Sequence, residues 1–279
     1  MVLDRAEQRE EAIQVCEAGL AESAESIRFA RTGARIAKAL GLDHSFPALP
    51  RLAHHRTMHL PHRRQGRAWS IDGEPSVSIE RAVLARLKAM GRSAIRSENE
   101  LWTTLFVLIY EPVFFADIDN AWPAPLLSRP ADLGTPSFIS RRKSQLTAHH
   151  ALLEAQGPGA VLTEAWNKRY GQRISGVYWR RWQLGELIEV VESLGVEALR
   201  AVLFPFLKTW RQAAKGLPDL VILPGPTTIV GGEPVSAGLT FVEIKGPGDT
   251  IRDAQRWWLG HLRGAGIAAE VWRVEPAQG

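Results

Sequence analysis

Two short apolar runs in the last third of the chain constrain its fold more than any other feature. The segments LPDLVIL (217–223) and LTFVEI (239–244) have the length and composition of strands, and the turn-rich stretch between them has room for one further short strand. A helix over residues 253–263 and a final strand over 269–274 are predicted to follow. Strands and a helix alternating in this way predict a mixed α/β core at this end of the chain.

Most of the chain before this core has the periodicity of helices. Apolar residues recur at three- and four-residue steps over residues 4–42, which predicts two amphipathic helices. The run Leu101–Ile109 is apolar nearly all round until Pro112 stops it, so this helix should be buried, with Ser97 and Glu100 as its capping box. Further helices are predicted over residues 78–90 and, separated by glycines, over residues 138–214.

Charge is concentrated in one segment. The chain carries 34 Lys and Arg against 30 Asp and Glu, a net charge of +4 that permits a polyanionic partner without requiring one. Residues 44–71 contain no acidic residue but five arginines, five histidines and three prolines, so we expect an irregular basic arm there. We do not expect the histidines to form a metal site, because no cysteine or carboxylate accompanies them and the prolines disfavour helical spacing.

Cysteine content and hydropathy indicate the compartment. The single cysteine, Cys16, excludes an internal disulfide framework and favours a reducing interior. No apolar run approaches the roughly 20 residues that cross a bilayer, and the first residues are too acidic and polar for a leader peptide. We therefore expect a soluble protein with no membrane partner, cytoplasmic and nucleoid-associated if bacterial. The ten tryptophans are expected in the core rather than as a base-stacking platform.

The two strand-like runs also carry the residues that indicate chemistry. Alternation along a strand puts Glu243 and Lys245 on one face, with Ile244 on the other, and pairing of the two strands can bring Asp219 beside them. Two carboxylates and an amine suit a Mg²⁺ or Mn²⁺ site that hydrolyses phosphodiesters. The alternative is a turn aspartate and an exposed ion pair. The sharp turn predicted at residues 246–249 favours the functional interpretation, because it would place both side chains at a cleft.

Five segments, in the same order along the chain, resemble one nuclease family. GLPDLVIL, FVEIKGPGD and AQRWWLGHLRGAGIAAEVWRV are similar to the VRR-NUC branch of the PD-(D/E)XK nucleases, and in particular to the catalytic end of the Fanconi-associated nucleases, including their bacterial members. IRSENELWTTLFVLIYEPVFF and PADLGTPSFISRR resemble two further segments of that family. The similarity covers residues 77–274. It implies an α/β, restriction-endonuclease-like mixed-sheet core at about residues 210–275, with a largely helical N-terminal half.

The resemblance also implies roles for single residues. It assigns Glu98, Asp219, Glu243 and the backbone carbonyl of Ile244 as metal ligands, and Lys245 as the catalytic lysine. Without it, Glu98 would pass for an ordinary first-turn glutamate of a helix. Two further positions match the family: Gln255 corresponds to a residue near the active site, and Arg211 corresponds to a basic residue that holds a 5′-phosphate. Their alternatives are an exposed helix glutamine and a solvated arginine.

The chain departs from the family in two ways. The family often has a second phosphate-binding basic residue where this chain has Ala254, with Arg252 and Arg256 as the nearest substitutes. Family members also carry a longer N-terminal DNA-binding region, so this chain is expected to be a short relative or the C-terminal part of a longer or split protein. We expect two parts, residues 1–75 with the helices and basic arm, and residues 76–279 with the nuclease domain.

The resulting hypothesis is a metal-dependent DNA nuclease. Mg²⁺ or Mn²⁺ is the expected cofactor, and branched or flapped DNA with a 5′-phosphate end is the expected partner. The resemblance implies 5′-flap endonuclease and 5′-to-3′ exonuclease activity in the repair of interstrand crosslinks. Arg63, Arg64, Arg141 and Arg142 are predicted to contact phosphates. The alternatives are another VRR-NUC role, such as junction resolution or restriction-type cleavage, and a DNA-binding fragment with little catalysis. The metal count and the oligomeric state stay open.

Overall fold

The computed structural model describes most of the chain. It covers residues 9–18, 20, 26–41, 46–47, 55–60, 62–65, 68–71, 74–97, 99–124 and 126–276. Of these residues, the side chains at 9, 10, 26, 62–65, 68–71, 74–77 and 276 are not described. Among the described residues, none of the helices has both the length and the apolar character needed to cross a membrane.

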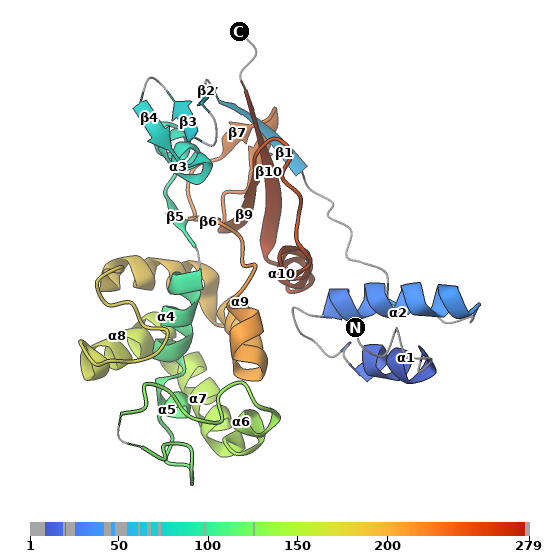
Figure 1. Ribbon diagram of the computed structural model, residues 1–279. Coiled ribbons are helices and arrows are strands. Elements are labelled where there is room, and N and C mark those ends of the chain that lie inside the picture. Colours follow the sequence, from blue (N-terminus) through green and yellow to red (C-terminus); the bar gives the residue numbers. More distant parts are fainter. Residues whose placement is uncertain are drawn as a thin grey trace.

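A five-stranded mixed sheet forms the centre of the C-terminal part (Figure 1). Its strand order is β1 (His55–Leu60), β10 (Ala268–Pro276), β9 (Thr240–Lys245), β6 (Leu220–Ile222) and β5 (Ala94–Arg96). Strands β1, β10 and β9 run parallel to one another, whereas β6 is antiparallel to β9 and β5 is antiparallel to β6. The strand and helix pattern predicted for the last third is therefore confirmed.

The basic arm is not irregular, so that expectation was wrong. Residues 55–60 form strand β1, which pairs with β10 across the boundary expected at residue 75. The next residues form an antiparallel sheet of β2 (His62–Gln65), β3 (Ala68–Ile71) and β4 (Glu74–Val77). The turn-rich stretch before β9 also contains two short strands instead of one, β7 (Thr228–Val230) and β8 (Glu233–Val235), which form a hairpin.

Both faces of the central sheet are covered, which explains why every residue of β9 is buried. On one face, α3 (Ile79–Ala89) packs Val83 and Leu87 into a cluster with Val242 and Ile244. The other face carries Phe241 and packs against a large helical core. The helices of that core nearest the sheet are α4 (Asn99–Ile109), α9 (Leu184–Ala213) and α10 (Asp253–Gly264).

Helix α4 lies at the middle of the helical part. Its residues Leu101 to Ile109 are all buried, as the apolar run predicts. Pro112 does not simply end the helix but falls in the first turn of a new one, where its missing N–H costs nothing. The helices that follow are α5 (Glu111–Phe114), α6 (Pro136–Ser140), α7 (Lys143–Gln156) and α8 (Pro158–Arg169). The predicted break at Gly195 is a kink within α9, at a positive φ of 71°.

The two amphipathic helices predicted at the start of the chain are present. They are α1 (Arg9–Ala18) and α2 (Ser26–Leu40), and they share a small core of their own that includes the buried Cys16. Figure 1 shows this pair to one side of the sheet, next to α10. Arg31 of α2 makes an ion pair with Asp253, the first residue of α10, at 2.6 Å.

Candidate active site

The polypeptide that enters β6 fixes Asp219. The carbonyl of Asp219 accepts a hydrogen bond from the Ser97 backbone N–H at 2.8 Å, and the Ser97 hydroxyl donates to the carbonyl of Pro218 at 2.5 Å. The predicted capping box was therefore wrong, because the Ser97 side chain serves this strand instead of α4. The Asp219 carboxylate accepts the backbone N–H of Ile244 at 2.7 Å, which holds it against β9.

Glu243 and Lys245 lie on the same face of β9, as alternation predicts. Lys245 Nζ lies 2.7 Å from Glu243 Oε1. Gln255, in the first turn of α10, joins them: its Nε2 donates to Glu243 Oε1 at 2.6 Å, and its Oε1 accepts from Lys245 Nζ at 3.1 Å. Gln255 Oε1 also accepts the Arg252 backbone N–H, so the start of α10 is tied to the pair. The structure thus brings together four residues that the sequence analysis singled out.

The Glu243 carboxylate is buried, with 1% of its residue surface exposed. Burial, and then the Asp219 charge, raises its pKa to about 8, although Lys245 opposes both effects. Because Lys245 and Gln255 both bind Oε1, the other oxygen, Oε2, accepts no hydrogen bond. A buried carboxylate oxygen that receives no hydrogen bond, beside a second carboxylate, provides oxygen ligands that fit a hard divalent cation.

A cleft of about 450 Å³ opens at this cluster. Asp219 and Gln255 line it, and so do two basic residues, Lys215 and Arg252. Gly216 also lines it and approaches the start of α10 closely: a Cβ there would lie 2.7 Å from the carbonyl carbon of Ala254, and φ is +82°. Only glycine fits this position without moving α10, and therefore Gln255.

Several predicted residues lie outside this cluster or outside the described residues. Glu98 and the side chains of Arg63 and Arg64 are outside the described residues. Arg211 is exposed in the last turn of α9 and does not line the cleft, and Ala254 does line it. Among described residues, no group of three or more His, Cys, Asp or Glu side chains could hold a metal.

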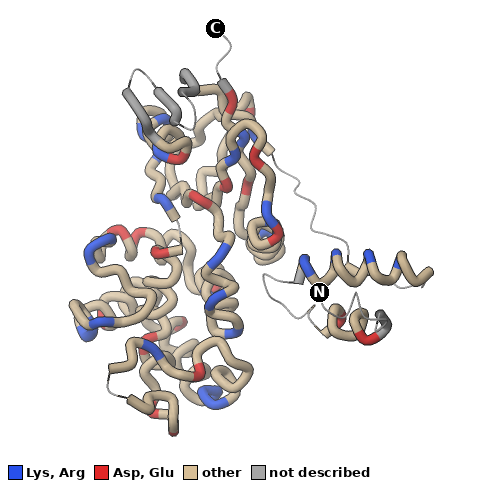
Figure 2. Tube along the Cα trace, in the orientation of Figure 1, with Lys and Arg blue, Asp and Glu red and all other residues tan. Residues whose placement is uncertain are grey.

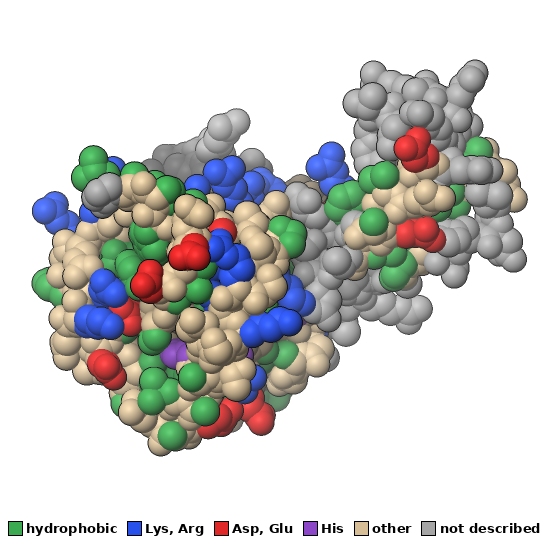
Figure 3. Space-filling model, turned by 90° about the horizontal axis from the view of Figure 1, so that it is seen from below, with side chains coloured by type: hydrophobic (Ala, Val, Ile, Leu, Met, Phe, Trp, Pro, Cys, Tyr) green, Lys and Arg blue, Asp and Glu red, His purple; other side chains and the backbone are tan. Residues whose placement is uncertain are grey.

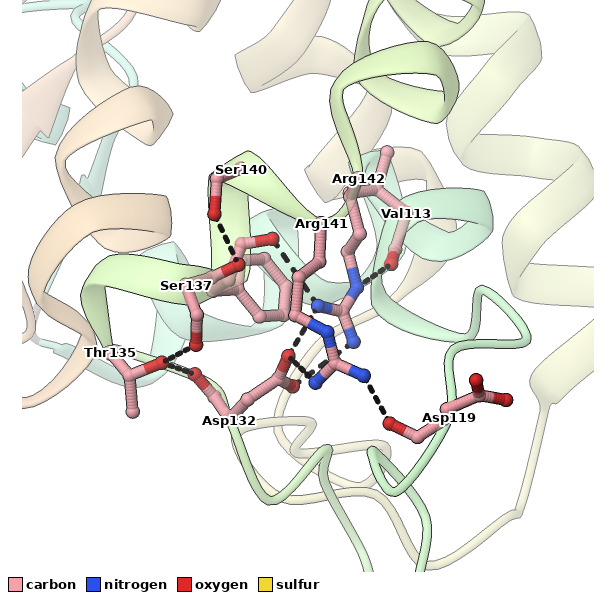
Figure 4. A network of polar contacts seen from close by, with 9 residues as sticks. Val113, Asp119, Asp132, Thr135, Ser137, Ser140, Arg141 and Arg142 are labelled. Carbon is pink, nitrogen blue, oxygen red and sulfur yellow. Dashed lines mark hydrogen bonds and ion pairs between the residues drawn. The ribbon is translucent and has the colours of Figure 1, made fainter.

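Arg142 was wrongly predicted to contact DNA phosphates. Its side chain is completely buried, and it forms two hydrogen bonds to Asp132, at 2.7 and 3.0 Å. Its Nε donates to the carbonyl of Val113, and its guanidinium lies over the Phe138 ring (Figure 4). Arg141 is one-third exposed, but it contacts Asp132 and the carbonyl of Asp119. This burial could not be predicted from the pattern of residues, because two adjacent arginines after a short apolar segment resemble a surface patch.

Arg56 of the basic arm is also engaged within the fold. Its guanidinium forms a bidentate pair with Glu270 of β10, at 2.5 and 2.9 Å, and only 10% of its side chain is exposed. Basic residues instead follow one another along α2, which contains no acidic residue, and near the end of α9 (Figure 2). On the face seen in Figure 3, residues of both signs are interspersed, so this face has no uniform positive charge.

One candidate phosphate contact in the cleft was not predicted from the sequence. Lys215 comes two residues before the Leu217 strand run, and the turn at Gly216 brings it to the cleft beside Asp219. The signal was available, since a basic residue close to a predicted catalytic aspartate is a candidate phosphate contact.

Comparisons with known proteins show which family this chain resembles. Residues 154–276 match the model of the VRR-NUC domain. Over 186 residues, the chain is 28% identical to the Fanconi-associated nuclease 1 homolog of Oryza sativa subsp. japonica, covering 67% of this chain and 19% of that protein. Over 203 residues it is 28% identical to Fanconi-associated nuclease 1 of Homo sapiens, and this match covers 71% of this chain and 19% of that protein. The chain thus spans about a fifth of the length of these curated relatives.

Solved structures extend the similarity over nearly the whole chain. Crystal structures of paFAN1 bound to 5′-flap DNA with a gap match with TM-scores of 0.76 for a one-nucleotide flap and 0.78 for a two-nucleotide flap. The identities are 27% and 28%, and each match covers 99% of this chain and 48% of that chain. The family resemblance and the restriction-endonuclease-like α/β fold class are therefore confirmed. The expectation of a bacterial-type member finds no support in these comparisons.

Proposed function

We propose that this chain, which carries a VRR-NUC domain over residues 154–276, is a divalent-metal-dependent nuclease that cleaves phosphodiester bonds of flapped or branched DNA. The observation that carries the proposal is the buried Glu243 oxygen without a hydrogen-bond donor, next to Asp219 and Lys245. The flap preference rests on the similarity to nucleases whose structures hold 5′-flap DNA.

Mg²⁺ or Mn²⁺ would be held by Asp219 and Glu243, with Glu98 and the Ile244 carbonyl as the further ligands that the resemblance implies, and would polarise the scissile phosphate. Lys245 Nζ orients the attacking water at the same cluster. Gln255 holds both Glu243 and Lys245, so that neither rotates away. Lys215 and Arg252 provide the cleft with positive charge for the DNA backbone.

The proposal is tested with a flap-cleavage assay with and without Mn²⁺, on the wild type, Asp219→Asn and Glu243→Gln. We expect cleavage by the wild type only, and gel shifts of the same DNA by all three proteins, because the variants keep the basic residues. Mn²⁺-dependent cutting by either variant would contradict the ligand assignment. A wild type that shifts DNA but never cuts it would favour the DNA-binding fragment.

We propose 5′-flap endonuclease and 5′-to-3′ exonuclease activity in crosslink repair, with Arg211 holding a 5′-terminal phosphate through charge-assisted hydrogen bonds. Flaps that differ only in a 5′-phosphate or 5′-hydroxyl should then be cut at different rates, and Arg211→Ala should remove the difference. Equal rates for the wild type would leave Arg211 a solvated arginine, and faster cutting of four-way junctions than of flaps would favour a resolvase.

A further inference from the structure

A second groove lies at the start of α4, beside the candidate active site. It has a volume of about 720 Å³, and Glu100 is one of its lining residues. The neighbouring residue, Asn99, lines the active-site cleft, so both hollows border the first turn of α4. The remaining lining residues all come from one stretch of chain, namely Tyr170, Gly171, Tyr178, Trp179, Arg180 and Arg181.

The groove contains an unusual share of the exposed aromatic surface. Of the three tyrosines in the chain, Tyr110 is buried, whereas Tyr170 and Tyr178 are 63% and 43% exposed, and both line this groove. Behind them, Trp179 lies edge-on to Trp166 at 5.1 Å and to Tyr170 at 5.5 Å. The tryptophans of this cluster are partly or fully buried, as expected, and both contact the exposed ring of Tyr170.

The segment that carries these rings is held rigidly. The Thr104 hydroxyl of α4 donates to the carbonyl of Glu100 at 2.7 Å, accepts the Tyr178 backbone N–H at 3.3 Å and lies 3.2 Å from the carbonyl of Gly176. Trp179 Nε1 donates to the carbonyl of Gln172 at 2.7 Å. A groove fixed in this way binds a ligand with little loss of conformational entropy.

The charge of the groove favours an anionic ligand. Arg180 and Arg181 are both exposed, and the side chain of Arg181 is 51% exposed. Glu100 lies 3.6 Å from Arg181, a distance too long for a strong hydrogen bond, and it is itself 42% exposed. Exposed aromatic rings next to arginines are the combination with which proteins bind single-stranded nucleic acid, because every base has a face that stacks and every phosphate attracts a guanidinium.

We propose that this groove binds unpaired nucleotides of a single DNA strand, stacking bases on Tyr170 and Tyr178 while Arg180 and Arg181 hold the phosphates. This inference rests on the proposed function, because a DNA nuclease whose active-site cleft borders the same turn of α4 makes a DNA strand the occupant. In the full reaction, the groove positions the unpaired strand of a branched substrate relative to Asp219 and Glu243. It makes no contact with the reacting atoms.

The test is binding of a fluorescein-labelled oligo(dT) of eight nucleotides, measured by anisotropy in EDTA, so that no cleavage occurs. We expect Tyr170→Ala and Tyr178→Ala each to weaken binding about 10-fold, and Tyr170→Phe and Tyr178→Phe to stay within about 2-fold, because phenylalanine keeps the ring that stacks. Arg180→Ala should weaken binding and flatten its salt dependence.

Matched controls separate the groove from general surface effects. Leu126→Ala removes a side chain that is 93% exposed, and Lys143→Ala removes an exposed charge at the start of α7; neither should change binding. Thermal unfolding of each variant should match the wild type within about 2 °C. Tyrosine-to-alanine variants that bind oligo(dT) as tightly as the wild type would overturn the inference. So would phenylalanine variants that lose as much binding as the alanine variants.

The outcomes for the groove and for the nuclease proposal can be distinguished. Metal-dependent cutting together with tyrosine-independent binding of oligo(dT) would overturn the groove alone. Tyrosine-dependent binding without any cutting would overturn the nuclease and leave a single-strand-binding surface. If the nuclease proposal and the groove inference both hold, Tyr170→Ala should slow the cutting of flaps more than the cutting of a nicked duplex that lacks an unpaired strand.

Discussion

Two clusters of buried charge differ in how completely their polar atoms are satisfied. In the helical part, the Arg142 guanidinium is enclosed, with both oxygens of Asp132, the carbonyl of Val113 and the ring of Phe138 as partners (Figure 4). At the sheet, Glu243 has two partners on one oxygen and none on the other, and a cleft opens beside it.

The difference separates structural from functional charge. A buried charge whose hydrogen bonds are complete stabilises a unique packing and has nothing left to offer a ligand. A buried carboxylate that lacks a donor and faces a second carboxylate is unfavourable until a cation arrives, so the fold must supply the stability of that region elsewhere. The comparison predicts that changes at the first cluster alter stability, and that changes at the second alter activity.

The largest expected effect is on catalysis. Lys245→Ala should lower the cleavage rate about 10²–10⁴-fold, the usual range for losing a group that acts on protons in the transition state. The folded protein should still bind Mn²⁺, because the lysine does not ligate it. Calorimetric titration with Mn²⁺ checks this, and Lys168→Ala, which removes an exposed lysine paired with the buried Glu111, is the control. A Lys245 variant that cannot bind Mn²⁺ would mean that the roles of Lys245 and of the metal-binding carboxylates are wrongly assigned.

The largest expected effect on stability is at the closed cluster. Arg142→Met should lower the free energy of unfolding by about 3 kcal/mol, because it removes the buried partner of Asp132 and leaves only the partly exposed Arg141 to pair with that charge. Arg200→Met, at an ion pair with Glu154 whose side chains are 39% and 55% exposed, should cost about 0–1 kcal/mol. Urea denaturation measures both. Equal costs would remove the distinction between the two kinds of charge.

The close approach at Gly216 links packing to the active site. Gly216→Ala should destabilise the protein by about 2–4 kcal/mol, since it combines overpacking with a positive φ. It should also lower activity, because the displaced part of α10 carries Gln255. Gly91→Ala is the control, with a φ of +75° and no atom within 4 Å of the added Cβ, so it carries the backbone strain alone. Activity lost equally in both variants would point to general destabilisation.

The smallest expected effect is a pH dependence of stability. Burial, and then the charge of His150, lowers the pKa of His149 to about 4 from its ordinary value of 6.5. Between these values the unfolded imidazole binds more protons than the folded one, so the contribution of His149 to stability is complete above pH 6.5 and falls toward pH 4, by about 2 kcal/mol. His149→Phe should flatten this slope in denaturation between pH 7.5 and 4.5. An unchanged slope would mean that His149 titrates alike in both states.

The site was more predictable than its surroundings. Asp219, Glu243 and Lys245 could be brought together from the sequence, because strand alternation and one pairing are local rules. The strands of the basic arm could not be predicted, because β1 is stabilised by its pairing with β10, more than 200 residues away. The partners of Arg56 and Arg142 are likewise distant in sequence or come from a loop, and a composition-based reading assigns both arginines to the surface.

The sequence by itself determined which residue types can do chemistry here, and that β9 must place a carboxylate and an amine on one buried face. Only the tertiary structure decided which of those groups are satisfied. Contacts between distant segments decide three things: whether an arginine is enclosed, whether one oxygen of Glu243 lacks a hydrogen-bond donor, and whether two tyrosines face solvent beside the cleft. Such contacts form because burial of apolar surface brings the segments together, and the polar groups are then paired or left open by the geometry that results.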